Sequence, residues 1–154
     1  MAKVTDAIIS IRPIFAEAIL SGLKTVELRR RIPPIEVGTR LWIYATRPVA
    51  AVIGSAIVDQ IIRGTPEYVW ESCASGAGLG RRDFDAYFGG AAEAVGLTLT
   101  KVRRAKPIEM EQLRSVRNGF HPPQVIAKLT LAEAISLKAL AREAKQSGAK
   151  TIRP

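Results

Sequence analysis

The sequence predicts an α+β domain, in which short helices pack around a small mixed β-barrel and an extra helix follows at the C-terminus. Three observations lead to this prediction. About five segments have the residue alternation or the continuous apolar runs that are typical of strands. Short helical segments with recognisable start and stop signals lie between them. The length of 154 residues suits one domain with a core of its own.

Strand-like and helix-like segments are interspersed along the chain. The strands are expected at residues 4–11, 26–31, 39–46, 49–62 and 92–104. The helices are expected at residues 13–20, 65–73, 81–88, 109–116 and 130–146. No repeat, low-complexity tract or linker interrupts the order. We therefore expect residues 1–130 to form one domain and residues 131–154 a helical extension with a basic tail.

Proline and glycine mark the boundaries in the N-terminal half. Pro13 suits the first turn of a helix, and Gly22 offers the left-handed conformation that closes it. The segment 39–46 is apolar on both faces, which indicates a central strand. In the following strand, Gly54 predicts a bulge or a bend.

Capping patterns mark the helices of the C-terminal half. Thr65-Pro66-Glu67 combines an N-cap, a proline at the first helical position and an acidic residue in the first turn. Aromatic residues at helical spacing predict that the helix at 81–88 faces the core. Thr130 and Glu133 form a capping box for the last helix. Ser147-Gly148 is expected to end it and to leave residues 149–154 as a frayed tail.

The last helix carries an apolar stripe. Its members recur at helical spacing and are Leu137, Leu140, Ala141 and Ala144. Docking of this stripe on the barrel is the expected arrangement, and docking on another subunit is the alternative. The sequence leaves the oligomeric state open.

The composition favours a polyanionic partner. With 23 Lys and Arg against 14 Asp and Glu, the net charge is +9 and the pI about 10.2. Such a field attracts nucleic acid first and an acidic membrane surface second, although it also fits a basic protein that its charge keeps soluble. Cys73 and His121 are the only residues of their types, so an intrachain disulfide and a cysteine-based zinc cluster are excluded.

Targeting signals are not recognisable in the sequence. The longest uncharged run, residues 48–58, is too short to cross a bilayer, and the first residues lack an apolar signal core. We therefore expect a cytoplasmic protein that does not associate with membranes. No pattern implies a cofactor or a metal ion.

Charged residues concentrate around a helix-to-strand corner at residues 21–31. Alternation puts Glu27, Arg29 and Arg31 on one face of the strand, with Lys24 in the turn before it. This arrangement predicts a polar and mainly cationic pocket floor. The alternative is a solvated strand face, where an exposed Glu27–Arg29 ion pair contributes about 0–1 kcal/mol.

The pattern Gly22-x-Lys24-x-x-Glu27-x-Arg29 resembles the signature of the ASCH domain, a family related to the PUA RNA-binding fold. Further stretches resemble the first strand of that family, its next core strand and its late Pro-Pro-Gln loop. They are Ile8-Ile9-Ser10-Ile11-Arg12-Pro13, Leu41-Trp42-Ile43-Tyr44-Ala45 and Phe120-His121-Pro122-Pro123-Gln124. The resemblance covers roughly residues 5–130. It implies a PUA-like fold.

The resemblance also implies binding of RNA or single-stranded nucleic acid, or of a modified base or nucleoside, beside the motif. Lys24 and Arg29 would hold a phosphate or a base edge, while Glu27 would orient the arginine or accept a base amino proton. Trp42 and Tyr44 share one face of a neighbouring strand. They are candidates for stacking a base, and packing inside the barrel is their alternative role.

An enzymatic function is the alternative to binding alone. One branch of the family comprises amidohydrolases that deacetylate N4-acetylcytidine with the motif lysine, and ribonuclease activity is suggested for other members. Lys24 matches that lysine, but Glu27 stands where the branch has threonine. Because a nearby carboxylate favours a charged ammonium, we expect Lys24 to stay charged near neutral pH. The branch also needs another glutamate, for which Glu71 and Glu93 are candidates.

Overall fold

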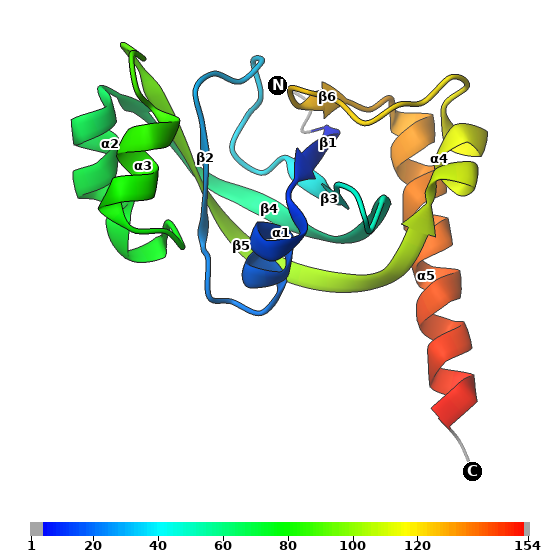
Figure 1. Cartoon of the computed structure of the whole chain (residues 1–154). Coiled ribbons are helices and arrows are strands. Elements are labelled where there is room, and N and C mark those ends of the chain that lie inside the picture. Colours follow the sequence, from blue (N-terminus) through cyan, green and yellow to red (C-terminus); the bar gives the residue numbers. More distant parts are fainter. Residues whose placement is uncertain (1–4, 153–154) are drawn as a thin grey trace.

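The structure is a computed structural model that describes the backbone of residues 5–152 and the side chains of residues 5–142. Its centre is one six-stranded sheet with the strand order β2-β5-β4-β3-β1-β6 (Figure 1). The strands are β1 (Asp6–Ile11), β2 (Val26–Arg29), β3 (Arg40–Ala45), β4 (Ala51–Gly64), β5 (Ala94–Glu109) and β6 (Ala127–Lys128). The helices are α1 (Pro13–Leu20), α2 (Pro66–Cys73), α3 (Arg81–Tyr87), α4 (Met110–Val116) and α5 (Leu131–Ile152), with a 3₁₀ turn at Ala74–Gly76.

The α+β prediction is confirmed, with one correction to the shape of the sheet. β1 pairs with β3 in parallel, and the other strand pairs are antiparallel. Within the described residues the two edge strands, β2 and β6, do not pair with each other, so the sheet is not a closed barrel. These edges have only 4 and 2 residues, which is too short for a continuous closing ladder.

The long ribbon of β4 and β5 bends at Gly54, as the sequence predicts. The pairing register shifts between Val52 and Gly54 and twice more further along the ribbon. A Cβ atom at Gly54 would lie 2.5 Å from the carbonyl oxygen of Arg103 and 2.6 Å from Leu20 Cδ2. Only glycine therefore allows the ribbon to pass this close to the end of α1.

Two pairs of helices lie at opposite ends of the sheet. Figure 1 shows α2 and α3 beside one end and α4 and α5 beside the other. Thr65 caps α2 by accepting a hydrogen bond from Tyr68 N at 3.2 Å. At the start of α5, Glu133 N donates to Thr130 Oγ1 at 3.1 Å, and Thr130 N donates to Glu133 Oε1 at 2.8 Å. The predicted caps of both helices are thus present.

The helix α5 docks on its own domain. Leu137 is fully buried, and Leu140 and Ala141 pack against the same apolar cluster, whereas the side chain of Ala144 lies outside the described residues. The prediction that Ser147-Gly148 ends the helix is wrong, because α5 runs on to Ile152. A glycine costs only about 1 kcal/mol inside a helix, which does not suffice to stop it.

The residues that the structure describes form three apolar core clusters. The first fills the face of the sheet under α1. The second lies on the other face, under α4 and α5, and contains Trp42 and Tyr44. The third joins β2 and the start of β5 to α2 and α3. In the described part of the chain, no helix combines the length and the apolar character needed to cross a bilayer.

Candidate functional site

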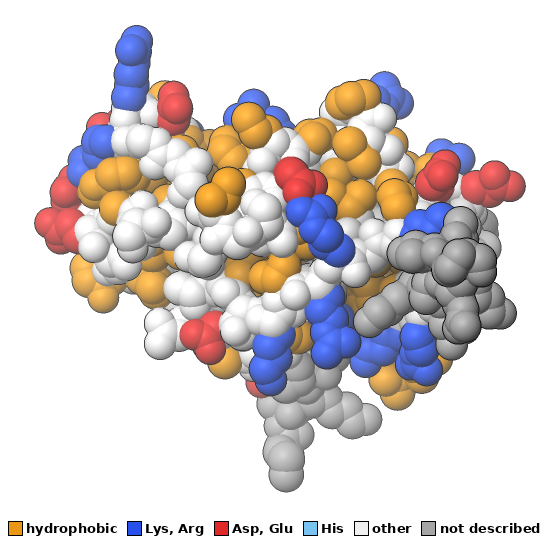
Figure 2. All heavy atoms as spheres, turned by 90° about the horizontal axis from the view of Figure 1, so that it is seen from below, with side chains coloured by type: hydrophobic (Ala, Val, Ile, Leu, Met, Phe, Trp, Pro, Cys, Tyr) orange, Lys and Arg blue, Asp and Glu red, His pale blue; other side chains and the backbone are white. Residues whose placement is uncertain are grey.

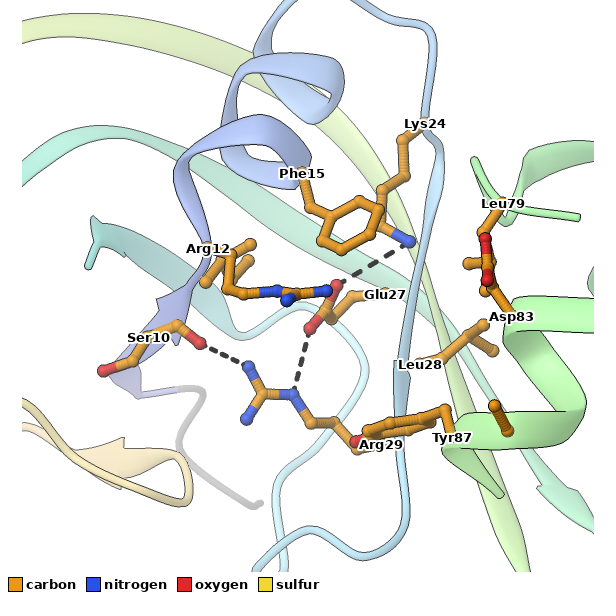
Figure 3. Close-up of a pocket in the computed structure, with 12 residues that line it drawn as sticks. Ser10, Arg12, Phe15, Lys24, Glu27, Leu28, Arg29, Leu79, Asp83 and Tyr87 are labelled. Carbon is orange, nitrogen blue, oxygen red and sulfur yellow. Dashed lines mark hydrogen bonds and ion pairs between the residues drawn. The ribbon is translucent and has the colours of Figure 1, made fainter. Parts of the chain in front are cut away.

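A cavity of about 670 Å³ opens where the end of β1, the start of α1, strand β2 and helix α3 meet. We call it the motif pocket, because Lys24, Glu27 and Arg29 all line it (Figure 3). The remaining lining residues are Ser10, Ile11, Arg12, Phe15, Leu28, Leu79, Asp83, Ala86 and Tyr87. The pocket thus combines apolar walls with a small number of charged groups, as ligand sites in proteins do.

Lys24 is buried in the wall of the motif pocket, with an exposed fraction of 3%. Its Nζ donates a hydrogen bond to the carbonyl oxygen of Ala77 at 2.5 Å and lies 5.3 Å from the centre of the Phe15 ring. Gly78, at a φ of +74°, brings the loop before α3 against the lysine stem, since a Cβ there would lie 3.0 Å from Lys24 Cβ.

Burial lowers the pKa of Lys24. The Glu27 carboxylate, 3.9 Å from Nζ, opposes this effect, and the positive charge of Arg29 adds to it. Desolvation is the largest of these contributions. Lys24 thus loses its proton more readily than a surface lysine does.

Glu27 and Arg29 form a part-buried ion pair. Arg29 Nε donates to Glu27 Oε2 at 3.0 Å, and the side chains are 14% and 9% exposed. Arg29 also donates through Nη2 to the carbonyl oxygen of Ser10 at 2.5 Å (Figure 3). The single carboxylate of the motif thus lies between two cations, which leaves the three-residue group with a positive balance.

Arg31 lies outside the motif pocket. The strand β2 ends at Arg29, so the alternation that predicts Arg31 on the same face does not continue to it. Its side chain is exposed and does not line the pocket. Arg30, just beyond the end of β2, donates to the carbonyl oxygens of Tyr87 and Gly89 and so holds the end of α3.

Trp42 and Tyr44 also lie away from the motif pocket. They are 3% and 2% exposed and belong to the apolar cluster under α4 and α5. Trp42 Nε1 donates to Asp6 Oδ2 at 2.8 Å, and the Tyr44 ring packs 6.3 Å from that of Phe120. Helices and loops cover this face of the central strand β3, so the ring faces are packed in the core and not free to stack a base beside the motif.

Several residues of the motif pocket are absent from the sequence-based prediction. Arg12 and Phe15 stand at the start of α1, where the Arg12 guanidinium carbon lies 5.2 Å from the ring centre. Asp83 and Tyr87 enter from α3. The aromatic spacing of α3 predicts a core-facing helix, and Phe84 is indeed buried, but Tyr87 is exposed at the pocket. No local signal distinguishes these two roles.

The candidate glutamates Glu71 and Glu93 are both exposed and do not line the motif pocket. Asp83 is the carboxylate that the structure adds to the pocket. Within the described residues, no three His, Cys, Asp or Glu side chains gather as a metal site requires.

A second cavity of about 530 Å³ contains the only histidine of the chain. Its lining residues are Tyr44, Thr46, Arg47, Ala50, Met110, Arg114, His121 and Pro122. Burial raises the pKa of the Tyr44 phenol, although Arg47 and Arg114 act in the opposite direction. A phenol, an imidazole and two guanidinium groups thus line one cavity, and no carboxylate is among its lining residues in the described structure.

The two cavities flank the ends of the parallel strands β1 and β3. Ser10, which lines the motif pocket, stands opposite Tyr44 in the register of these strands. The Thr46 backbone N–H donates to the carbonyl oxygen of Ile11 at 3.0 Å just beyond. The carboxyl ends of adjacent parallel strands are a common place for ligand sites.

Comparison with known proteins identifies the family. The family model of the ASCH domain matches residues 9–138. An ASCH domain-containing ribonuclease of Zymomonas mobilis is 41% identical over 135 residues, which cover 88% of this chain and 91% of that protein. The crystal structure of an ASCH protein from Zymomonas mobilis matches with a TM-score of 0.85 and 40% identity, over 88% of this chain and 95% of the other.

A more distant structure, a hypothetical protein from Leishmania major, has a TM-score of 0.59 at 11% identity over 93% of this chain and 98% of the other, and shows the shared fold alone. The resemblance to the ASCH domain family is thus confirmed. The chain belongs to the ASCH domain family.

Proposed function

We propose that this protein binds single-stranded RNA and cleaves it. The observation that carries the proposal is the 41% identity, over 88% of the chain, to a protein named as an ASCH domain-containing ribonuclease. The net charge of +9 supports it, because a cationic surface attracts the RNA backbone. The two cavities beside β1 and β3 supply the groups that binding and cleavage require.

The motif pocket takes one nucleotide of the strand in this proposal. Arg29 is oriented by Glu27 and by the Ser10 carbonyl oxygen, so its free N–H groups are preorganised for a phosphate or a base edge. Lys24 adds a second cation at the pocket wall. A volume of about 670 Å³ is in the range of pockets that hold small ligands.

Cleavage takes place in the second cavity in this proposal. The 2′-hydroxyl of the RNA attacks the adjacent phosphorus, and the bond to the 5′-oxygen of the next nucleotide breaks. His121 is the candidate base that removes the hydroxyl proton. The phenol of Tyr44 is the candidate acid for the 5′-oxygen, because a phenol carries its proton near neutral pH and this one lines the same cavity as His121. Arg47 and Arg114 then stabilise the charge on the phosphate oxygens.

The test uses a labelled single-stranded RNA and a DNA of the same sequence, which lacks the 2′-hydroxyl. We expect the wild type to cut only the RNA. Tyr44→Phe keeps the buried ring and removes only the hydroxyl, so it should slow cleavage about 10²-fold or more, as His121→Ala should. Cleavage at the wild-type rate in both variants would place the reaction elsewhere. If the wild type binds RNA but does not cleave it, the protein is an RNA-binding protein and not a ribonuclease.

A second candidate function is hydrolysis of an acylated nucleoside such as N4-acetylcytidine. The observation in its favour is the burial of Lys24, which lowers the pKa of the amine and so makes it a better nucleophile or base. In this case the wild type should release acetate, and Lys24→Arg should be inactive because arginine stays protonated. If Lys24 is only a fixed cation, Lys24→Arg should instead retain most of the RNA binding.

A further inference from the structure

A third cavity of about 550 Å³ lies between the middle of the sheet and helix α5. Five of its lining residues are cationic, and we call the site the basic groove. Its cations are Arg40, Arg103, Arg104, Lys138 and Arg142, and its other lining residues are Trp42, Ser55, Ala105 and Ala141. No carboxylate is among these lining residues.

Strand register and helix docking bring these cations together. In the β4–β5 ribbon, Arg103 stands opposite Ser55, and β3 begins at Arg40 beside them. Burial of Leu137 fixes the rotation of α5 on the sheet. Lys138 and Arg142, one helical turn apart, both line the groove as a result.

Two of the arginines are held by neighbours. Arg40 Nη1 donates to Ser55 Oγ at 3.2 Å, and its guanidinium carbon lies 6.0 Å from the centre of the Trp42 ring. Arg104 forms a two-point ion pair with Glu17, in which Nη1 lies 3.1 Å from Oε1. The contacts of Arg40 orient its guanidinium before any ligand arrives, whereas the charge of Arg104 is balanced by Glu17.

The remaining cations of the basic groove are not neutralised by any carboxylate whose side chain the structure describes. Over residues 5–142, no ion pair joins Arg103, Lys138 or Arg142 to an acidic residue. Like charges in one groove repel each other, and a bound polyanion relieves that repulsion. Figure 2 shows several Lys and Arg side chains on the face of the molecule that is seen from below.

We propose that the basic groove binds the phosphate backbone of single-stranded RNA, as a contact surface additional to the motif pocket. Four of the five cations are arginines, whose planar fork suits phosphate oxygens. The five cations come from two strands, β3 and β5, and from helix α5, so their charges are spread along the groove as successive phosphates require. This inference rests on the proposed RNA binding and adds the part of the surface that the strand follows.

The experiment measures RNA affinity over a salt series for matched double variants. Arg103→Ala/Arg142→Ala removes two groove charges. Arg63→Ala/Arg82→Ala removes two exposed arginines that line none of the three cavities. We expect the groove variant to bind at least about 10-fold more weakly at low salt, with a salt slope lower by about 1.4, since each phosphate contact contributes about 0.7. The control should stay within about 2-fold of the wild type.

A charge-preserving variant separates charge from folding. Arg103→Lys/Arg142→Lys should keep the wild-type salt slope, and the melting temperatures of all variants should agree with that of the wild type. If the groove variant and the control variant lose the same amount of RNA affinity while the wild type binds RNA, this inference alone is overturned. A wild type that binds no RNA would overturn the proposed function together with it. A poly-glutamate peptide is the probe for an acidic protein partner. If it binds more tightly than RNA, and this binding requires Arg103 and Arg142, the groove binds an acidic protein instead of RNA.

Discussion

Arg29 and Arg30 are sequence neighbours with different roles at the end of β2. Arg29 is part-buried and connects Glu27 to the carbonyl oxygen of Ser10 inside the motif pocket. Arg30 is exposed and holds the C-terminal end of α3 through two carbonyl oxygens. The end of β2 thus separates Arg29, a pocket residue, from Arg30, which holds the end of α3.

We predict that Arg29→Ala weakens binding of a nucleotide by about 1.5–3 kcal/mol, because it removes a charged and largely desolvated hydrogen-bond donor. Arg30→Ala should weaken binding less than Arg29→Ala, because Arg30 is exposed and contacts the backbone at the end of α3 and not the pocket itself. Isothermal titration with a mononucleotide compares the two variants. Equal losses would mean that binding uses a diffuse basic surface and not the motif pocket.

The lowered pKa of Lys24 makes stability depend on pH. Its ordinary value is 10.5, and burial sets the folded-state value below that. Between the two values the unfolded chain binds more protons than the folded one, so the free energy of unfolding rises with pH over this interval. Lys24→Met should lack this rise. The difference in unfolding free energy between wild type and variant should therefore grow from neutral pH to about pH 10.

Urea unfolding over that pH range measures this difference for Lys24. Lys106→Met, which replaces an exposed lysine, is the matched control and should give a flat difference. A flat difference for Lys24→Met as well would show that Lys24 titrates like a surface lysine. Such a result would also remove the main argument for a nucleophilic lysine.

At the scale of elements, the start of α5 joins the last helix to the loop after α4. Glu133 closes the capping box with Thr130 and accepts from Arg117 Nε and Nη2, each at 2.8 Å. The hydrogen bond from Arg117 is the main reason that the pKa of Glu133 falls to about 2. One carboxylate thus anchors both segments, and α5 in turn carries one wall of the basic groove.

We predict that Glu133→Gln destabilises the protein by about 1–2 kcal/mol at neutral pH, since it weakens a cap and leaves Arg117 without its ion pair. A carboxylate with a lowered pKa stabilises the folded state at pH values above its ordinary pKa of 4.5. This stabilisation is lost as the pH falls toward about 2. The difference in stability between the wild type and Glu133→Gln, measured by thermal unfolding, should therefore become smaller over that acidic range. Glu111→Gln, on the exposed side of α4, should show no such difference.

At the scale of the whole molecule, the excess of cations is distributed over separate surfaces. The motif pocket, the second cavity and the basic groove each contain two or more cationic residues. The pocket also holds two carboxylates, Glu27 and Asp83, whereas no carboxylate is among the described residues that line the groove. The basic groove therefore contributes more than the motif pocket to the positive electrostatic potential around the protein.

We predict that affinity for a single-stranded RNA falls as salt rises from about 50 to 200 mM, with a slope of about 0.7 for each phosphate engaged. Binding of an uncharged nucleoside should change little over the same range, because it releases no counterions. Fluorescence anisotropy for the RNA and calorimetry for the nucleoside test the two halves. A flat dependence for the RNA would contradict a polyanionic ligand and leave only a small-molecule pocket.

Patterns that extend over a few residues determine much of this protein from the sequence alone. The helix caps at Thr65 and Thr130 and the bend at Gly54 depend on neighbours in the chain, and they are confirmed, as is the family that the sequence resembles. The end of α5 is the local prediction that is wrong, since packing and helix continuity outweigh one glycine. Function at the motif stays a prediction, because it depends on a ligand.

Only the tertiary structure decides how these local elements enclose space. Short edge strands leave the sheet open, and helices on both sides turn the Trp42–Tyr44 face of β3 into core. The hydrogen bond from Lys24 to the Ala77 carbonyl oxygen joins residues 53 positions apart, and the basic groove joins β3 to α5. Residue periodicity extends over one or two turns or strands, so it contains no information about contacts at such separations.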